Sequence, residues 1–196
     1  MTVQDQYFVV KSTSDSPMFG WNQPSGDYGM GYPLMSTEPV KLKVSENAGP
    51  EPNWRDFHAL DGAAISDRLK RVLEPLDLYG VEYVPADVET PSAPSVQAPT
   101  YWFWHVWNEI TCVDRAHSVL ELSPRGRIIS IDKLVLDEPL LGRFERRKTL
   151  IFRLREKPST LIVHRLLKEA IEQAGATGMR FFPAREWSSN AIFVER

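Results

Sequence analysis

The sequence of 196 residues contains a single cysteine and no long apolar segment. Cys112 alone cannot form an internal disulfide, which fits a reducing compartment. Because no run of about 18 apolar residues occurs, we expect no transmembrane helix. The first residues also lack the basic and apolar regions of a secretory signal. These absences favour a cytoplasmic protein that does not contact a membrane.

Neither sign of charge dominates, since 23 Lys and Arg residues face 26 Asp and Glu residues and give a formal net charge of −3. This value is too small to indicate a nucleic-acid partner. The distribution is uneven, with a net −7 over residues 1–100 and +4 over residues 101–196. Much of the positive charge lies in one run: Arg143, Arg146, Arg147, Lys148, Arg153, Arg155 and Lys157. We interpret it as a solvated loop and strand edge. The alternative is a phosphate-binding face, used by a nucleic-acid-binding domain or by an unrecognised enzyme.

Two segments are typical of loops. Residues 44–53 are polar and interrupted by prolines, and residues 89–100 contain Pro91, Pro94 and Pro99. The second segment also marks the change of charge, which makes it a candidate subdomain boundary. We nevertheless expect one domain over residues 1–196, because residues 1–88 hold few apolar runs. Whether residues 1–55 belong to the same folded unit is left open.

Hydrophobic periodicity predicts two helices. The first covers residues 66–76, with Ser66 as its cap and an apolar stripe that includes Leu69 and Leu73. The second has Ser159 as its N-cap and ends at Gly175.

Apolar and β-branched runs predict strands over residues 7–10, 81–84, 101–107, 118–122, 127–136, 150–154 and 179–182. Residues 101–107 are apolar on both faces and therefore indicate a central strand, whereas Pro85 and Pro183 should end the strands that precede them. Residues 123–126 should form the turn of a hairpin. The predicted fold class is α+β, a mostly antiparallel sheet with at least two packed amphipathic helices.

No motif indicates catalysis, a cofactor or a metal. Cys112 lies near His105 and His117 in the sequence, but a buried inert thiol is the preferred interpretation. The histidines lack the spacing of zinc ligands, and we expect His164 to be a partly covered surface residue. Asp137-Glu138 could form a carboxylate pair, although turns also use such acids. We therefore expect no enzyme.

A series of short segments resembles the immunity protein family numbered eleven of bacterial polymorphic-toxin systems. The segments begin with an opening aromatic strand and continue with pieces of the later chain. They include Tyr7-Phe8-Val9-Val10, Asp56-Phe57, Ile65-Ser66-Asp67-Arg68-Leu69-Lys70, Val84-Pro85, Tyr101-Trp102, Cys112-Val113-Asp114-Arg115, Lys133-Leu134-Val135-Leu136-Asp137 and Gly175-Ala176-Thr177-Gly178-Met179-Arg180-Phe181. The resemblance covers most of residues 55–190 but leaves residues 15–32 and 89–100 unmatched. It implies a cytoplasmic protein that binds and blocks a cognate toxin, with no catalytic residues.

Interfaces favour Trp, Tyr and Arg side chains that are partly exposed before binding. Trp21, Tyr28, Trp54 and Trp187 fit this description better than the strand tryptophans, and Arg185 lies beside the last of them. We predict these five residues as partner contacts. The acidic first half would suit a basic toxin such as a nuclease. The sequence does not indicate an oligomeric state.

Overall fold

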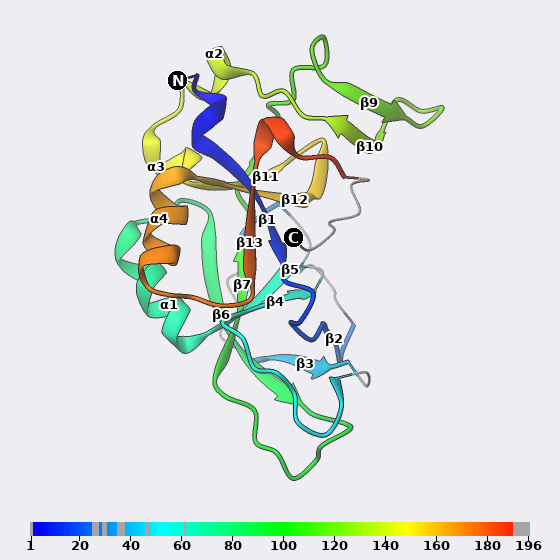
Figure 1. Ribbon diagram of the computed structural model, residues 1–196, viewed down its shortest axis with the longest axis vertical. Helices are drawn as coiled ribbons and strands as arrows, with labels where there is room; N and C mark the ends of the chain where they lie inside the picture. The colour runs from blue at the N-terminus through cyan, green and yellow to red at the C-terminus, as the bar shows by residue number, and fades with distance from the viewer. Residues whose placement is uncertain are drawn as a thin grey trace.

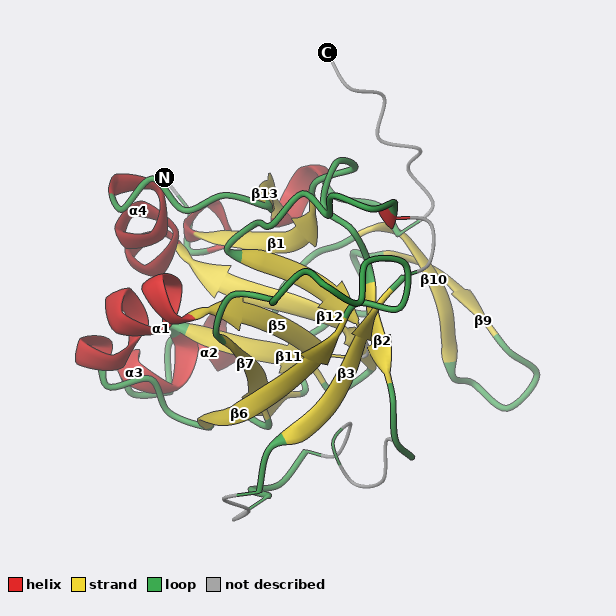
Figure 2. Cartoon of the chain, turned by 90° about the horizontal axis from the view of Figure 1, so that it is seen from below, coloured by secondary structure: helices red, strands yellow, loops and turns green. Residues whose placement is uncertain are grey.

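The computed structural model describes residues 2–24, 28, 31–34, 38–45, 48–60 and 62–189. In it, two sheets and a separate hairpin form most of the chain (Figures 1 and 2). The five-stranded sheet has the order β13 (Met179–Pro183), β1 (Tyr7–Ser12), β12 (Lys157–His164), β11 (Ile151–Leu154) and β8 (Glu109–Ile110). The six-stranded sheet has the order β2 (Phe19–Trp21), β3 (Val40–Val44), β6 (Val81–Glu89), β7 (Tyr101–Val106), β5 (Gly62–Ser66) and β4 (Phe57–Leu60). The hairpin pairs β9 (Val119–Leu122) with β10 (Ile128–Lys133).

Most pairings are antiparallel, and β3 with β6 and β8 with β11 are the parallel ones among the described strands. The helices are α1 (Asp67–Leu73), α2 (Glu138–Leu141), α3 (Arg146–Thr149) and α4 (Arg165–Gln173). Short 3-10 turns cover Gln4–Gln6, Glu74–Leu76 and Ala184–Glu186. The predicted α+β class, mostly antiparallel with at least two helices, is therefore confirmed. None of the helices in the described ranges is long and apolar enough to cross a membrane.

Helices α1 and α4 lie side by side at one end of the two sheets (Figures 1 and 2). Their buried residues Leu69, Leu73, Leu167 and Ile171 share one core cluster with Trp104 of β7. That cluster also contains residues of β1, β11 and β12, so both sheets contribute to it. Strands from residues 1–55 enter both sheets, as β1 in one and β2 and β3 in the other. The assignment of residues 1–196 to one domain stays a prediction that this shared core supports.

Several local predictions are confirmed. The Ser66 hydroxyl caps α1 by accepting a hydrogen bond from the Leu69 amide at 3.1 Å. Strand β7 is central and almost entirely buried. The predicted hairpin turns at Gly126, whose positive φ of 73° suits glycine. Gly175 follows α4 with a φ of 64°, as expected for a helix C-terminus.

One of the two proline boundary predictions is wrong. Pro85 does not end a strand, because β6 continues to Glu89. Pro85 pairs with Trp102 of β7, and pairing with β3 begins only at the next residue, Ala86. On the β3 side, the N–H that proline lacks is therefore not needed for a hydrogen bond. Pro183, in contrast, is the last residue of β13, as predicted, and pairs with Phe8.

Ser159 is not a helix cap, because residues 157–164 form β12 between β1 and β11. Thr160, Ile162 and Val163 are β-branched and buried there. The actual N-cap of α4 is His164, whose Nδ1 accepts a hydrogen bond from the Leu166 amide at 3.1 Å.

Candidate partner-binding surface

Asp56 is the centre of a polar network that joins α1 to the end of α4. Its carboxylate accepts hydrogen bonds from Arg68 Nη2 at 2.6 Å, Ser66 Oγ at 2.7 Å and the Thr177 amide at 2.8 Å. Burial alone would raise the pKa of Asp56, but these hydrogen bonds outweigh it and hold the pKa well below its usual range. Arg68 also donates to the carbonyl oxygens of Ala174 and Gly175. The residues of this hydrogen-bond network therefore stabilise the fold.

His58 forms a second internal network, between β4 and β7. The ring is fully buried and stacks on Phe19 with centroids 4.2 Å apart. Its Nε2 accepts a hydrogen bond from the Arg55 amide and lies 3.0 Å from the Tyr101 hydroxyl, while Nδ1 lies 2.9 Å from the Pro17 carbonyl oxygen. Burial lowers the pKa of His58, so the neutral ring is the stable form.

The groups considered for catalysis also have structural partners. Cys112 is buried as expected, and burial raises the pKa of its thiol. His117 Nδ1 lies 2.7 Å from Asp114, whose carboxylate also orders the local turn. Asp137 caps α2 through the Leu140 amide. Within the described ranges, no group of three or more His, Cys, Asp or Glu residues is arranged to hold a metal ion.

The prediction that His164 is partly covered at the surface is wrong. Only 3% of His164 is exposed, because β12 places it between β1 and β11. Its Nε2 lies 2.9 Å from Arg146 Nη1 and 2.8 Å from Gln6 Oε1. Burial and the neighbouring guanidinium groups of Arg146 and Arg165 lower the pKa of His164 to about 4.

The basic run predicted as a loop and strand edge is divided among several elements. Arg146 in α3 lies beside His164, as described above. Arg153 in β11 turns inward and donates to the carbonyl oxygens of Val106 and Pro158. Lys157 donates to the Ile129 carbonyl oxygen of the hairpin. Strand β11 is an interior strand, so the strand-edge interpretation is wrong for Arg153.

Three of the five predicted contact residues gather beside the six-stranded sheet. Trp21 stacks on Tyr28 with centroids 5.0 Å apart and also meets Phe103 edge-on. Trp54 packs near Phe19 and Tyr101. Trp21, Tyr28 and Trp54 are half-buried, which is consistent with the partial exposure we expected. Their contact with a partner stays a prediction.

Of the other two residues, Trp187 differs from expectation, whereas Arg185 is exposed and its contact with a partner stays a prediction. Trp187 is only 1% exposed and belongs to a core cluster with Tyr7, Val9 and Phe152, so the prediction of partial exposure is wrong. The 3-10 turn Ala184–Glu186 returns the chain to β1 and buries the indole, with Lys11 Nζ 5.5 Å from its ring centroid. Arg185 is exposed and lies 2.7 Å from Asp5.

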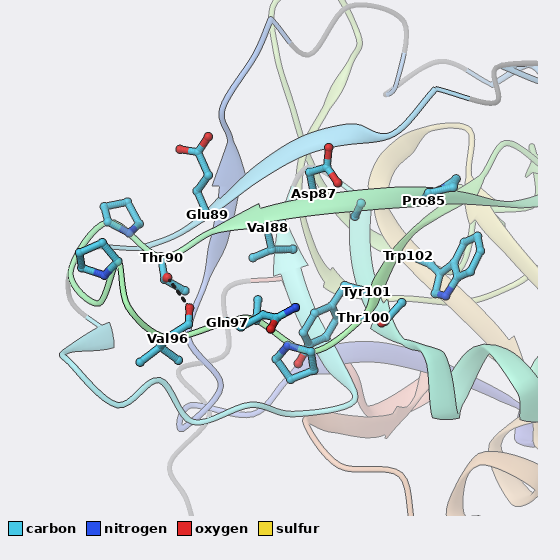
Figure 3. Close-up of a pocket in the computed structure, with 15 residues that line it drawn as sticks. Pro85, Asp87, Val88, Glu89, Thr90, Val96, Gln97, Thr100, Tyr101 and Trp102 are labelled. Carbon is cyan, nitrogen blue, oxygen red and sulfur yellow. Dashed lines mark hydrogen bonds between the residues drawn. The ribbon is translucent and has the colours of Figure 1, made fainter.

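The pocket in Figure 3 lies between the end of β6 and the proline-rich loop 90–100. Its volume is about 650 Å³. Strand β6 extends past Ala86, the last residue that pairs with β7, and the loop leaves a space before it returns at Tyr101. Thr90 Oγ1 holds this loop by donating to the carbonyl oxygens of Ala93 and Val96. The loop predicted over residues 89–100 is confirmed from residue 90 onwards.

The lining of the pocket includes Asp87, Glu89, Tyr101 and Trp102 but no Lys or Arg. Asp87 and Glu89 are exposed, and their side chains point to the side of β6 opposite Val88 and the loop (Figure 3). Lys41 and Lys43 of β3 are in register with them. Tyr101 and half-buried Trp102 lie on β7, and the Trp102 ring already has Lys70 Nζ 4.3 Å from its centroid. The residue types are therefore those that attract a cationic group.

A second pocket of about 360 Å³ is formed by residues 14–18 together with Ser45, Ala48, Glu51 and Asn53. It too is lined by carboxylates, Asp15 and Glu51, without Lys or Arg, although Asp15 pairs with nearby Arg55. Met18 beside it is 64% exposed. We call residues 13–18, 45, 48–55 and 87–102 the loop end. Sequence reasoning missed Asp87 and Glu89. The sequence pattern that could have identified them is two acidic residues at alternate positions of a strand, directly before a proline-rich loop.

The fold and these sites define a protein whose buried polar groups stabilise its structure and whose loops offer acidic, aromatic-lined pockets. A family model described as Immunity protein family (Imm11) matches residues 3–186, and the chain belongs to this family. The match confirms the resemblance and extends it across residues 15–32 and 89–100. No curated protein matches the chain.

Proposed function

We propose that this protein binds a cognate toxin in the cytoplasm and neutralises it by protein–protein contact, without catalysis. Membership of an immunity family supports the general role. Buried structural partners for His58, His164 and Cys112 agree with a role that requires no reactive side chain.

We further propose that the loop end is the toxin-binding surface. The observation that carries this proposal is the pocket between β6 and loop 90–100, with Asp87 and Glu89 at its edge and no cationic residue in its lining. Complementary charge increases the rate of association and selects partners. A basic surface on the toxin, such as nucleases present to nucleic acid, fits this pocket.

Half-buried Trp54 strengthens this choice of surface, because its ring packs near Tyr101, a residue of the pocket lining. A rigid aromatic group beside a charged pocket is a common arrangement of interface hot spots. Trp21 and Tyr28 lie outside the loop end, where they stack on each other and meet Phe103 of the same sheet, and we propose them as further contacts of the partner.

Affinity capture of the tagged protein from its host, followed by mass spectrometry, tests the proposed function. We expect to capture one stoichiometric protein. Expression of that protein alone should arrest growth, and co-expression of the tagged protein should relieve this toxicity. Recovery of nucleic acid without a protein partner would contradict the proposal and favour a nucleic-acid-binding function of the Arg143–Lys157 run.

A further inference from the structure

The β9–β10 hairpin extends from the body of the molecule, away from the loop end (Figure 1). One of its faces is anchored, because Ile128 and Ile131 are buried in a core cluster against which Leu120 also packs. The hairpin is therefore held in place before any partner arrives. This preformed state lowers the entropy lost on binding.

The hairpin carries an unusual share of exposed apolar side chains. Val119, Leu122 and Ile129 are 52%, 47% and 50% exposed. They are three of the seven large hydrophobic residues that are exposed in the described part of the chain. Val119 and Leu122 are three residues apart in β9, so each face of this strand carries one exposed apolar side chain.

The two edges of the hairpin differ. The outer edge of β10 is covered, because the Ser189 amide donates to the Ile131 carbonyl oxygen and Lys157 Nζ donates to that of Ile129. Strand β9 pairs with β10 on one side and has no described strand on the other. An open strand edge with apolar side chains accepts a further strand.

The exposed cations at the turn of the hairpin favour an acidic partner, whereas exposed Glu121 and Asp132 lie on its strands. Arg125 and Arg127 flank the turn at Gly126, Lys133 lies at the end of β10, and all three are exposed. Within the described ranges, no salt bridge involves these three cations. The nearby Glu121, in contrast, accepts a hydrogen bond from Ser130 at 2.8 Å.

We propose that the open edge of β9 binds an extended segment of a partner protein in which apolar and acidic residues alternate. The main chain of the segment would add a third strand to the hairpin. Its apolar side chains would cover Leu122, and its carboxylates would pair with Arg125 and Arg127. This site is separate from the loop end and does not depend on the proposed neutralisation of a toxin.

A labelled peptide of alternating Glu and Val tests this site, with a peptide of alternating Lys and Val as its control. Fluorescence anisotropy should show at least about tenfold tighter binding of the acidic peptide to the wild-type protein. The double variant Arg125→Glu/Arg127→Glu should reverse the preference. The matched double variant Lys41→Glu/Lys43→Glu, which changes two exposed strand lysines on β3 by the same charge, should retain it.

Hydrogen exchange of backbone amides separates strand addition from attraction of charge alone. The acidic peptide should slow exchange in residues 119–122, because added strands form main-chain hydrogen bonds. Equal binding of the two peptides, or binding without protection of these amides, would overturn the proposal. So would a concentration-dependent dimer that protects β9 in the absence of peptide, since the occupant would then be a second copy of the chain.

Discussion

The guanidinium of Arg68 lies 2.6 Å from the carboxylate of Asp56, and this pair connects the first turn of α1 with the C-terminal end of α4. The side chain of Asp56 is 10% exposed and that of Arg68 is 54% exposed. Both belong to segments that carry the family resemblance, and Thr177 of the same network belongs to another. These segments of the family resemblance therefore contain residues that connect two helices distant in the sequence.

Replacing Asp56 by Ala should lower the free energy of unfolding by about 2–3 kcal/mol, because Ser66, Arg68 and Thr177 all lose their acceptor. Urea denaturation measures this change. Arg71→Ala is the matched control, since it removes an exposed i,i+4 pair with Asp67 and should change stability by less than about 0.5 kcal/mol. Equal effects of the two substitutions would show that the network adds nothing to an ordinary surface pair.

Stability should fall as the pH decreases from about 6.5 towards 4, because folding lowers the pKa of His164 from an ordinary value of 6.5 to about 4. The unfolded chain binds the proton throughout this interval, whereas the folded chain does not. Stability is therefore highest above pH 6.5, where the ring is neutral in both states. Protonation of the unfolded chain lowers the free energy of unfolding by about 3 kcal/mol by pH 4. Thermal unfolding across this pH range measures it.

His58 and His105 add to the same trend, since burial lowers the pKa of each. His164→Asn isolates one share of the effect, because Asn can cap a helix but does not titrate in this range. The variant should show a smaller loss of stability between pH 6.5 and 4 than the wild type. An unchanged slope would assign the pH dependence to the other histidines.

Trp187→Ala and Trp54→Ala should affect different properties. Trp187 is buried among core residues, so its truncation should cost about 3–5 kcal/mol of stability. Trp54 is half-buried at the loop end, and its truncation should weaken capture of the partner more than it lowers the melting temperature. A folded Trp187→Ala protein with intact stability and weakened capture would contradict this assignment.

Gly178→Ala should be more destabilising than Gly175→Ala, although both positions have positive φ. A Cβ at Gly178 would lie 2.4 Å from the Phe57 carbonyl oxygen, whereas a Cβ at Gly175 would meet nothing within 4 Å. We expect losses of about 3 kcal/mol and about 1 kcal/mol. Chemical denaturation of the two variants checks the difference, and similar losses would show that backbone conformation alone decides.

Local sequence patterns predicted the elements whose structure depends little on residues distant in the sequence. Ser66 with its apolar stripe identified α1, and the two apolar faces of residues 101–107 identified the central strand. The start of α4 was wrong because Val163 fits both a helical stripe and a buried strand. The pairing of β12 with β11 and with β1, which is distant in the sequence, decides between them.

The candidate site depends even more on distant contacts. Trp187 follows a short turn and resembles an exposed loop residue until β1 and β11 cover it. The pocket beside Asp87 and Glu89 exists because β6 continues beyond its pairing with β7, a difference in strand length that residue types alone do not encode. Tyr101 and Trp102 were correctly placed in a central strand, but their position at its exposed end was not predicted.

Calorimetric titration of the captured toxin with Asp87→Asn/Glu89→Gln tests the central claim most directly. The matched control is Glu169→Gln/Glu172→Gln, which makes the same change of charge on exposed residues of α4. The account predicts at least about tenfold weaker binding for the loop-end variant and an unchanged affinity for the control. Wild-type affinity in both variants would contradict the placement of the toxin at the loop end.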